Sequence, residues 1–325
     1  MEENLYEQRA DINKLNDAVI NIRNEISKVI VGQHKMVDLL LIALLCDGHV
    51  LIEGVPGVAK TLTAKLLAKI IDTSFSRIQF TPDLMPSDVL GTSVFNPKEA
   101  EFEFKRGPVF SNIILIDEIN RAPAKTQSAL FEVMEERQVT IDGTTHFMDF
   151  PFLVIATQNP IEQEGTYRLP EAQLDRFLFK IIINYPTVEE EINILLNQQS
   201  VPQNTLLESV RKIISPSQVT EYRNITNEVI IDPNLVEFIA KIVNETRNNS
   251  SLYLGASPRA SLAILRSAKA NAAMMGRDFV KPEDIIEMAK PVIRHRIILT
   301  PEKEMEGITA DELINEIISK IEVPR

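Results

Sequence analysis

A loop that ends in lysine and threonine is the part of the sequence whose residue types point most directly to chemistry. It follows the apolar stretch His49–Glu53 and precedes a helical pattern, a context in which backbone N–H groups and a helix N-terminus surround a phosphate. We expect Lys60 to reach the outer phosphates of a nucleotide and the Thr61 hydroxyl to bind Mg²⁺. The predicted nucleotide-binding residues of this loop are Gly54, Val55, Pro56, Gly57, Val58, Ala59, Lys60, Thr61 and Leu62.

Ala59 stands where a phosphate-binding loop of the strict pattern has its second glycine. A methyl group is tolerated there only where the backbone keeps a negative φ and no ligand atom touches the α-carbon. Taken alone, this imperfect loop also fits a glycine turn with an incidental lysine. A second element is needed to decide between the two interpretations.

A pair of adjacent carboxylates follows another apolar stretch, Asn112–Ile116. The carboxyl ends of such strands lie where ligands bind in open α/β sheets. Asp117 is then placed to hold Mg²⁺ through water, and Glu118 to polarise an attacking water molecule. Two acids after a strand are more often a solvated turn. Their position after a phosphate-binding loop in chain order favours a nucleotide-hydrolysing site.

A third polar strand end is Thr157–Pro160, which follows the apolar stretch Phe152–Ala156. Asn159 is a candidate sensor residue that would orient the attacking water. Asn-Pro is also a common turn, and in isolation the turn is the better interpretation. Because this strand comes next after the two acids, we retain Asn159 as a site residue.

Two arginines are further candidates for the site. Arg176 precedes the predicted strand Phe177–Ile183. Ser257 has the residue type of an N-cap and Pro258 that of the first helical residue, which places Arg259 in the first helical turn. The helix dipole disfavours a cation there by about 0.3 kcal/mol or more, and a neighbouring γ-phosphate would reverse that sign. The alternative for Arg259 is a solvated arginine.

The order of elements predicts two domains. The first part alternates short apolar strands with helices, as in an α/β domain with a parallel sheet. Its predicted strands and helices are His49–Glu53, Thr61–Ile71, Arg77–Phe80, Asn112–Ile116, Lys125–Glu136, Phe152–Ala156 and Phe177–Ile183. After Asn184 the pattern is helical, at Val188–Gln199, Asn234–Arg247, Pro258–Met275 and Pro282–Arg294. We therefore expect an α/β domain over residues 1–184 and an all-helical domain over residues 185–325.

Two segments interrupt the α/β pattern. Residues 91–110 contain the alternating run Glu101–Phe104, and residues 138–150 contain a strand-like Val139–Ile141 followed by Asp142-Gly143, a hairpin signal. Both are predicted as hairpins inserted between core elements. The alternative for each is an ordinary surface loop.

The composition excludes several classes of function. With a net charge of −12 and no basic run, the chain is not expected to bind nucleic acid, although a local basic patch is compatible with an acidic total. The 4 histidines are scattered and there is 1 cysteine, so the sequence has no zinc spacing.

Cysteine use and hydropathy bear on the compartment. Cys46 as the single cysteine excludes an internal disulfide and fits a reducing compartment. It ends the longest apolar run, Met36–Cys46, which Asp38 interrupts and which is shorter than the ~18 residues of a membrane span. We expect that run to be a buried helix and the chain to have no transmembrane segment. Because Met1–Lys14 is polar and lacks the apolar part of a signal peptide, we expect a cytoplasmic protein.

These residues, in this order, resemble those of AAA+ ATPases, and the detailed sequences of the motifs are similar to those of the MoxR family. The loop with its alanine variant, Gly54–Thr61, and the segment Asp117–Pro123 carry much of the resemblance. Further similar segments are Ile30–Gln33, Met134–Val139, Ala156–Pro160, Leu169–Phe177, Ala256–Arg259 and Pro291–Arg296. The resemblance extends from about Ile26 to Ile298, nearly the whole chain.

The resemblance implies a P-loop AAA+ core with a five-stranded parallel sheet, followed by a helical lid, and ATP and Mg²⁺ as ligands. Residues 91–110 would be the helix-2 insert and 138–150 the pre-sensor hairpin. The resemblance places Val31, Gly32 and Gln33 beside the adenine. It also implies that Arg176 acts as a finger on the ATP of a neighbouring subunit, with Arg168 in reserve. The alternative for Arg176 is an intrachain salt bridge with Asp175 or an acid of the lid.

Members of the family assemble into hexameric rings and remodel protein clients, often with a partner that bears a von Willebrand A domain, and some support metal-cofactor insertion. Because core and lid account for the 325 residues, we expect any such partner to be a separate chain.

The leading interpretation is an ATPase that couples hydrolysis to remodelling or maturation of a protein partner. A nucleic-acid motor or loader on the same core is an alternative, which the acidic total disfavours. A nucleotide-dependent binding switch that hardly hydrolyses ATP is a third. Glu118 argues against a switch, because a pure switch needs no acid that polarises water.

Overall fold

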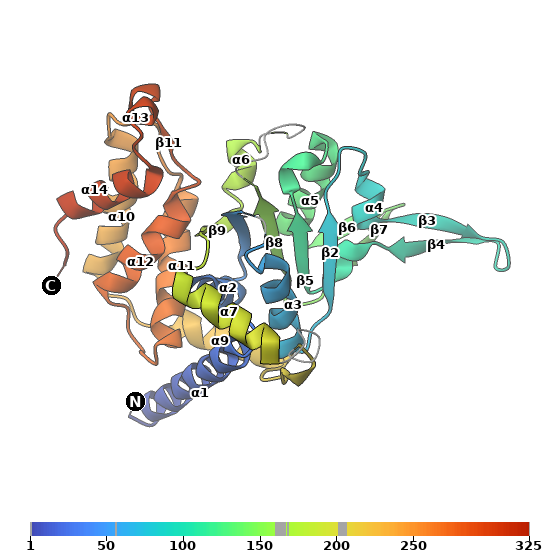
Figure 1. The fold of residues 1–325 in the computed structure, drawn as a ribbon, viewed down its shortest axis with the longest axis horizontal. Helices are drawn as coiled ribbons and strands as arrows, with labels where there is room; N and C mark the ends of the chain where they lie inside the picture. Colours follow the sequence, from blue (N-terminus) through green and yellow to red (C-terminus); the bar gives the residue numbers. More distant parts are fainter. Residues whose placement is uncertain (1, 56, 160–166, 168, 201–206, 325) are drawn as a thin grey trace.

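The structure is a computed structural model that describes residues 2–55, 57–159, 167, 169–200 and 207–324. In Figure 1 an α/β core occupies the middle, the C-terminal helices lie to its left and a long hairpin projects to its right. Pro56 of the predicted loop and Arg168, the reserve finger, lie outside the described residues.

Five parallel strands form the central sheet in the order β2-β5-β8-β1-β9, as expected. The strands are β1 (His49–Gly54), β2 (Phe75–Gln79), β5 (Ile113–Asp117), β8 (Leu153–Gln158) and β9 (Phe177–Ile183). The register pairs Glu53 with Gln158 and Gln79 with Asp117. The carboxyl ends of β1, β2, β5 and β8 therefore meet at one end of the sheet.

Helices cover both faces of this sheet. They are α1 (Glu2–Ser27), α2 (His34–Leu45), α3 (Lys60–Ile70), α4 (Pro86–Leu90), α5 (Ala124–Glu136) and α6 (Glu171–Leu174), with short 3₁₀ turns η1 (Pro108–Phe110) and η2 (Ile119–Arg121). Successive side chains of a strand point to opposite faces, so Val50 and Ile113 pack with α1, α2 and α3, whereas Leu51 and Ile114 pack with α5. Burial on both faces is why these strands are apolar almost throughout.

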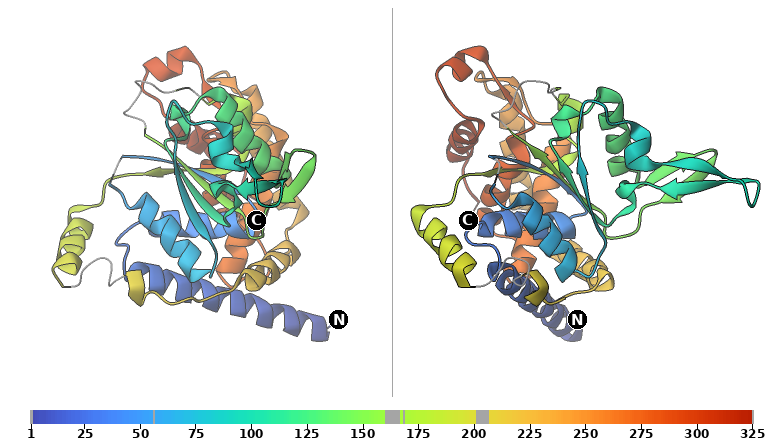
Figure 2. Two further views of the ribbon diagram at one scale, coloured as in Figure 1. Left: turned by 90° about the vertical axis from the view of Figure 1, so that its right-hand side faces the viewer. Right: turned by 45° about the vertical axis from the view of Figure 1, so that its right-hand side comes forward.

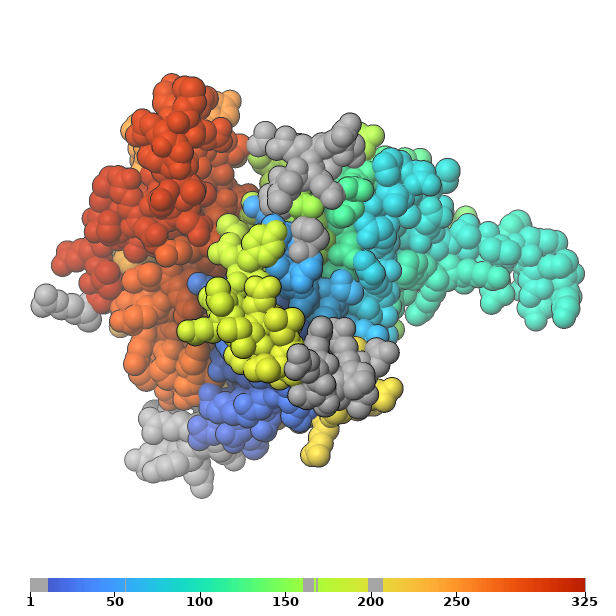
Figure 3. Space-filling model, in the orientation of Figure 1, coloured from blue at the N-terminus to red at the C-terminus, as the bar shows by residue number. Residues whose placement is uncertain are grey.

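Both predicted hairpins are present. They consist of β3 (Gly91–Asn96) with β4 (Glu101–Arg106) and β6 (Gln138–Ile141) with β7 (Thr144–Phe147). Asp142 and Gly143 have φ values of 50° and 78°, the positive pair that a tight hairpin turn requires. The Ser93 hydroxyl donates to the Asp142 carboxylate, which joins the two hairpins. Figure 3 shows β3 and β4 extending well beyond the rest of the surface.

The C-terminal part is mainly helical, and its four predicted helices are correct to within one residue at each end. Its elements are α7 (Val188–Ser200), α9 (Pro216–Glu228), α10 (Pro233–Asn248), β10 (Leu252–Leu254), α11 (Pro258–Met274), α12 (Pro282–Ile293), β11 (Ile298–Leu299), α13 (Pro301–Met305) and α14 (Ala310–Lys320). The antiparallel pair β10 and β11 departs from the all-helical expectation. Strands this short give no periodic pattern in the sequence.

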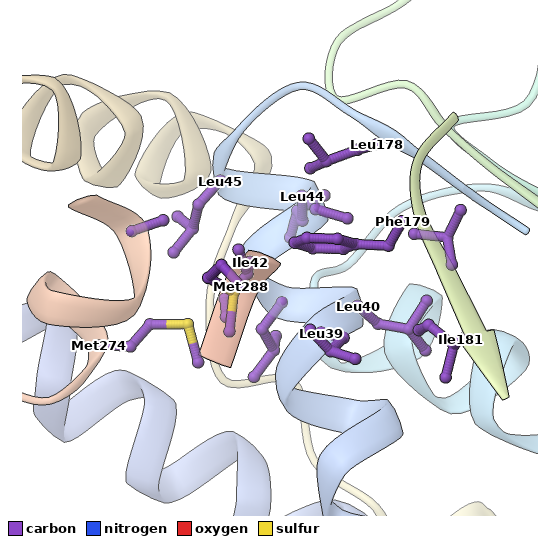
Figure 4. Close-up of a cluster of buried hydrophobic side chains, with 14 of the residues drawn as sticks. Leu39, Leu40, Ile42, Leu44, Leu45, Leu178, Phe179, Ile181, Met274 and Met288 are labelled. Carbon is purple, nitrogen blue, oxygen red and sulfur yellow. The ribbon is translucent and has the colours of Figure 1, made fainter. Parts of the chain in front are cut away.

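Helix α2 joins the two parts of the molecule. In Figure 4 its leucines pack against Phe179 and Ile181 of β9 on one side and lie near Met274 of α11 and Met288 of α12 on the other. This is the buried helix predicted from the apolar run Met36–Cys46. Among the described residues, no helix combines the length and apolar character that crossing a bilayer requires.

Helix α1 is an element that was not predicted from the sequence. Its buried residues, Ile12, Leu15, Val19, Ile22 and Ile26, recur at helical spacing and contact the core. Figure 2 shows α1 running along the base of the molecule, where it meets α3, α9 and α11. This helical spacing of apolar residues is visible in the sequence, after the polar residues with which the chain begins.

Two buried histidines stabilise the junctions of these elements. His49 Nδ1 accepts a hydrogen bond from the backbone N–H of Val154 at 3.0 Å, so the other ring nitrogen carries the proton and donates to Met134 O at 3.1 Å. His295 bonds to Phe177 O at 3.0 Å through Nε2. Burial is the main cause that lowers the pKa of both histidines well below the ordinary value.

We predict that acid destabilises the fold through these histidines. Because their pKa is lower in the folded state, the unfolded chain binds more protons below about pH 6.5, and each histidine removes ~1.4 kcal/mol of unfolding free energy per pH unit. The contribution of the two histidines to the free energy of unfolding is complete above that pH and is lost as the pH falls. His49→Asn should therefore flatten the slope of unfolding free energy against pH between 6.5 and 5.5, measured by urea titration. Equal slopes for the two proteins would contradict this role for His49.

Candidate functional site

The phosphate-binding loop joins the end of β1 to the start of α3, as predicted. Lys60 is the first residue of α3, and its Nζ donates a hydrogen bond of 2.8 Å to the carbonyl oxygen of Gly54 across the loop. Burial is the main cause that lowers the pKa of Lys60, and the carboxylates of Asp117 and Glu118 act in the opposite direction. The lysine thus lies within electrostatic reach of both predicted acids.

Gly54 is required for a steric reason. A β-carbon at this position would lie 2.8 Å from the carbonyl oxygen of Ile183 on β9, closer than real β-carbons approach other atoms. The beginning of the loop is therefore in direct backbone contact with the end of the neighbouring strand.

The backbone of Ala59 does not meet the condition under which a methyl group is readily tolerated there. Its φ of 59° and ψ of 20° lie in the left-handed region and not at a negative φ. The loop must turn into α3 at this residue, and its carbonyl oxygen accepts bonds from the N–H of Thr63 at 2.9 Å and its hydroxyl at 3.0 Å. A left-handed backbone costs an alanine ~1 kcal/mol, and such strain gathers at functional sites where surrounding contacts hold it.

A cavity of about 390 Å³ opens beside the loop. Its lining residues are Gly57, Val58, Ala59, Lys60, Thr61 and Leu62, together with Val29, Ile30, Val31, Ile194 and Asn197. Of the segment expected beside the adenine, Val31 lines the cavity, whereas Gly32 packs against the side chain of Glu190 and Gln33 precedes α2 as its N-cap. Apolar walls next to a phosphate loop suit a nucleotide with its base.

Asp117 is fixed by both neighbouring strands. The Thr157 hydroxyl on β8 donates to Asp117 Oδ1 at 3.2 Å and accepts from the backbone N–H of Glu118 at 3.0 Å. From β2, Arg77 Nε donates to Asp117 Oδ2 at 2.6 Å. One threonine hydroxyl therefore joins the two predicted acids, and the arrangement is not a solvated turn.

Glu118 leaves the strand in a left-handed conformation, with φ 57° and ψ 52°. Its Oε2 accepts a hydrogen bond from Gln79 Nε2 at 3.0 Å and lies 2.9 Å from Arg121 Nε. The side chain is 29% exposed, so a ligand or water can reach it. A strained residue with an oriented, accessible carboxylate is typical of an active site.

Asn159 lies at the same end of the sheet. It follows Gln158, which pairs with Glu53 at the end of β1, and it is partly buried. The structure thus brings Asn159 to the end of the sheet that holds the loop and the two acids. The alternative Asn-Pro turn involves Pro160, outside the described residues.

The two arginines lie together at the opposite end of the sheet. Arg176 precedes Phe177, which pairs with His49 at the beginning of β1, whereas the loop follows the end of β1. The 7 residues of β9 span ~20 Å, so Arg176 is about that far from its own phosphate loop. Arg259 lines the same groove as Arg176 and therefore lies at the same end of the sheet.

Glu135 of α5 contacts both arginines. Its Oε1 accepts from Arg259 at 3.1 Å, and its Oε2 is 3.9 Å from Arg176 Nε. Arg176 also donates to the carbonyl oxygen of Phe131. An intrachain ion pair of Arg176 therefore exists, but with Glu135 rather than with Asp175 or an acid of the lid. Exposed pairs of this kind contribute about 0–1 kcal/mol, so a stronger anion can displace Glu135.

Asp175 and Arg296 hold this end of the site together. Asp175 accepts from Arg296 Nε at 2.7 Å and from the Ser257 hydroxyl at 3.0 Å. The buried Arg296 also donates to the carbonyl oxygen of Phe177 at 2.6 Å. Ser257 is the predicted N-cap, since its hydroxyl accepts from the N–H of Arg259 at 3.2 Å. The Asp175 carboxylate thus links the N-cap of the Arg259 helix to the buried guanidinium of Arg296, which in turn binds the start of β9.

The residues at the loop end of the sheet fit Mg²⁺ and ATP. Thr61 lines the cavity, and both oxygens of Asp117 retain lone pairs beyond the hydrogen bonds described above. Mg²⁺ is commonly held by one or two protein oxygens together with substrate phosphates, which this donor set allows.

Sequence reasoning missed several residues of the site. Thr157 was seen only as part of a strand end, although a hydroxyl there is the link between the two acids. Gln79 and Glu135 belong to elements far away in the sequence, and their contacts depend on strand and helix packing. A hydroxyl residue at the end of the strand that follows the two acids is the signal that could have identified Thr157.

Two family models match the chain. The model described as ATPase family associated with various cellular activities (AAA) matches residues 49–179, and the one described as AAA lid domain matches residues 244–317. The first range contains the loop, both acids, Asn159 and Arg176, and the second contains Arg259.

The chain is similar over most of its length to two bacterial proteins and one solved structure. It is 44% identical over 325 residues to Chaperone MoxR1 of Mycobacterium tuberculosis, covering 97% of this chain and 84% of that protein. It is 48% identical over 300 residues to the uncharacterised protein YeaC of Bacillus subtilis, covering 92% of each. The crystal structure of a protein from Cytophaga hutchinsonii, proposed to be an ATPase, matches with a TM-score of 0.91, 46% identity and 99% coverage of both chains.

We predict that Thr157→Val impairs ATP turnover more than ATP binding. The valine leaves the N–H of Glu118 and one oxygen of Asp117 without their shared partner, and loss of such a bond costs ~1–3 kcal/mol, or roughly 10–100-fold in rate. Thr157→Ser keeps the hydroxyl and should retain most of the activity. Phosphate release and calorimetric ATP binding measure the two effects. Unchanged turnover in Thr157→Val would remove the hydroxyl from the site.

Proposed function

This chain belongs to the MoxR family of AAA+ ATPases, and from that premise we propose that it hydrolyses ATP within a homo-oligomeric ring to remodel or mature a protein partner. The observation that carries the ring is the separation of Arg176 and Arg259 from the loop of the same chain by about the length of β9. If these arginines act on ATP, they act on that of a neighbour.

In this proposal Lys60 and the backbone N–H groups of the loop bind the outer phosphates. Thr61 and Asp117 would hold Mg²⁺, and the ion would neutralise part of the phosphate charge. Glu118, oriented by Gln79 and Arg121, accepts a proton from the attacking water, and Asn159 orients that water.

The water oxygen then bonds to the γ-phosphorus while the bond from that phosphorus to the bridging oxygen breaks, giving ADP and phosphate. Arg176 of the neighbouring subunit, with Arg259 beside it, offers permanent positive charge to the phosphoryl oxygens as charge shifts during transfer.

The remaining parts of the proposal rest on the family and on composition. We place the boundary between core and lid at residues 184 and 185, and we propose a hexameric ring in the cytoplasm. The client is a protein, and a separate chain with a von Willebrand A domain is the partner we would test first. The net charge of −12 disfavours nucleic acid as the client.

Lys60→Ala should abolish ATP binding or turnover. The lysine is the side-chain cation of the phosphate loop, so its loss leaves the phosphates with backbone donors alone. Lys65→Ala, on an exposed position of the same helix, is the matched control and should behave as the parent protein. If calorimetric ATP binding and steady-state hydrolysis were both unchanged in Lys60→Ala, the assignment of this loop as the phosphate-binding loop would be contradicted.

A mixing experiment tests the trans role of Arg176. Arg176→Ala subunits keep an intact loop but have no finger to lend, and Glu118→Gln subunits lend a finger but lack the base. Each variant alone should bind ATP with turnover lowered by roughly 10³-fold or more. Mixed rings should regain part of the activity, measured as phosphate release, where a Glu118→Gln subunit faces an Arg176→Ala site.

Mass photometry must first show that each variant and the mixture form rings. No recovery in rings shown to be mixed, or full activity of Arg176→Ala alone, would count against the proposed role of Arg176. Near-normal turnover in Glu118→Gln would likewise remove Glu118 from the mechanism.

A further inference from the structure

The cavity beside the phosphate-binding loop has one polar side chain that the proposed chemistry does not use. Of the described residues that line it, Lys60, Thr61 and Asn197 have polar side chains, and the first two belong to the loop. Outside the loop the other lining residues are apolar, namely Val29, Ile30, Val31 and Ile194. Apolar walls suit the base of a nucleotide. Asn197 is therefore a polar group beside the part of the cavity that fits a base.

Asn197 lies on the inner face of α7. Glu190, Ile194 and Asn197 follow one another at spacings of four and three residues, which puts them on one face of the helix. Ile194 and Asn197 line the cavity, and Glu190 packs against Gly32, the residue after Val31. In Figure 1 α7 crosses in front of α3, whose first residues line the same cavity. This inner face of α7 is thus one wall of the cavity.

The first turn of α7 is fixed in place by Glu190. Its Oε2 accepts from the backbone N–H of Thr187 at 2.8 Å, and its own N–H donates to the Thr187 hydroxyl at 3.3 Å. This reciprocal cap defines where the helix begins. A β-carbon at Gly32 would lie 2.6 Å from Glu190 Oε1, so the carboxylate occupies space that only a glycine leaves open. The contact holds the inner face of α7 against the segment that ends the apolar wall.

The amide of Asn197 matches the hydrogen-bonding pattern of adenine. A carboxamide presents one acceptor and one donor side by side. Each polar edge of adenine that includes the exocyclic amine pairs this donor with a ring nitrogen that accepts, and asparagine is a common partner of such an edge. Ile194 precedes Asn197 by about 4.5 Å along the helix axis, so a base packed on Ile194 presents its edge to the amide. Asn197 is exposed, so a ligand can reach it.

We propose that Asn197 is a specificity-determining residue that binds the base of the nucleotide. Its carbonyl oxygen accepts a hydrogen bond from the exocyclic amine of adenine, and its NH₂ group donates one to the adjacent ring nitrogen. The inference rests on the proposed function in one respect, since it takes this cavity to be the nucleotide site. The phosphates then bind the loop before α3, while the base binds a helix that follows the sheet.

Calorimetry with two diphosphates tests this contact. ADP and purine riboside 5′-diphosphate differ only in the exocyclic amine, and neither has a γ-phosphate to hydrolyse. The parent protein should bind ADP roughly fivefold more tightly than the analogue, as expected of one hydrogen bond. In Asn197→Leu, which has a similar size and no polar group, this ratio should fall about threefold or more. Comparing two ligands with two proteins separates the side chain from any backbone contact of the amine.

A second substitution separates the two hydrogen bonds. In Asn197→Asp the carboxylate still accepts from the amine but cannot donate to the ring nitrogen. The preference for ADP should therefore remain, while the affinity for both diphosphates falls roughly fivefold. Asn193→Leu and Asn193→Asp are the matched controls, because Asn193 is exposed one turn earlier on α7 and does not line the cavity. Both control variants should keep the ratio of the parent protein.

The outcomes for the contact and for ATP hydrolysis can be told apart. An unchanged ratio in Asn197→Leu, an equal change in Asn193→Leu, or no preference for ADP in the parent protein would overturn the role of Asn197, even if ATP turnover is normal. The expected ratios in a parent protein without ATP turnover would support the contact and refute the proposed hydrolysis. A parent protein that binds neither diphosphate would contradict both.

Discussion

The parallel register of the five-stranded sheet is the constraint on which the site depends. Because β1, β5 and β8 run in one direction, their carboxyl ends lie side by side, and the loop before Lys60, the acids Asp117 and Glu118, and Asn159 meet although they are far apart in the sequence. The hydroxyl of Thr157 then converts neighbouring strand ends into one hydrogen-bonded unit. The same register places Arg176, at the beginning of β9, at the other end.

Under the proposed function, that division gives each subunit two incomplete halves of a reaction centre. One half binds and hydrolyses, and the other offers two guanidinium groups that in the single chain rest on Glu135. The exposed pairs with Glu135 are weak, so they keep the arginines oriented without preventing transfer to a phosphate. The buried Arg296 performs a different task, since its bonds to Asp175 and to Phe177 keep strand and lid helix in fixed relation.

Much of the fold could be predicted because its signals are local. The central strands β5 and β8 are apolar almost throughout since both faces are buried, Asp142-Gly143 marks a turn, and Ser257-Pro258 marks a helix start. The left-handed backbone of Ala59 and the contacts of Glu135 could not be predicted, because they arise from how distant elements meet. Helix α1 was missed although its buried residues recur at helical spacing, so that error lay in interpretation.

Strand β9 connects the two groups of residues that the proposed function assigns to the nucleotide. Its first residue follows Arg176, and the carbonyl oxygen of its last residue, Ile183, lies against Gly54 at a separation that leaves no room for a β-carbon. A hydrogen-bonded strand is stiff along its length, so an axial shift of one end displaces the other. If Arg176 acts on a neighbour's ATP as proposed, the loss of phosphate at that site would be felt through β9 at the phosphate-binding loop of the subunit that carries Arg176.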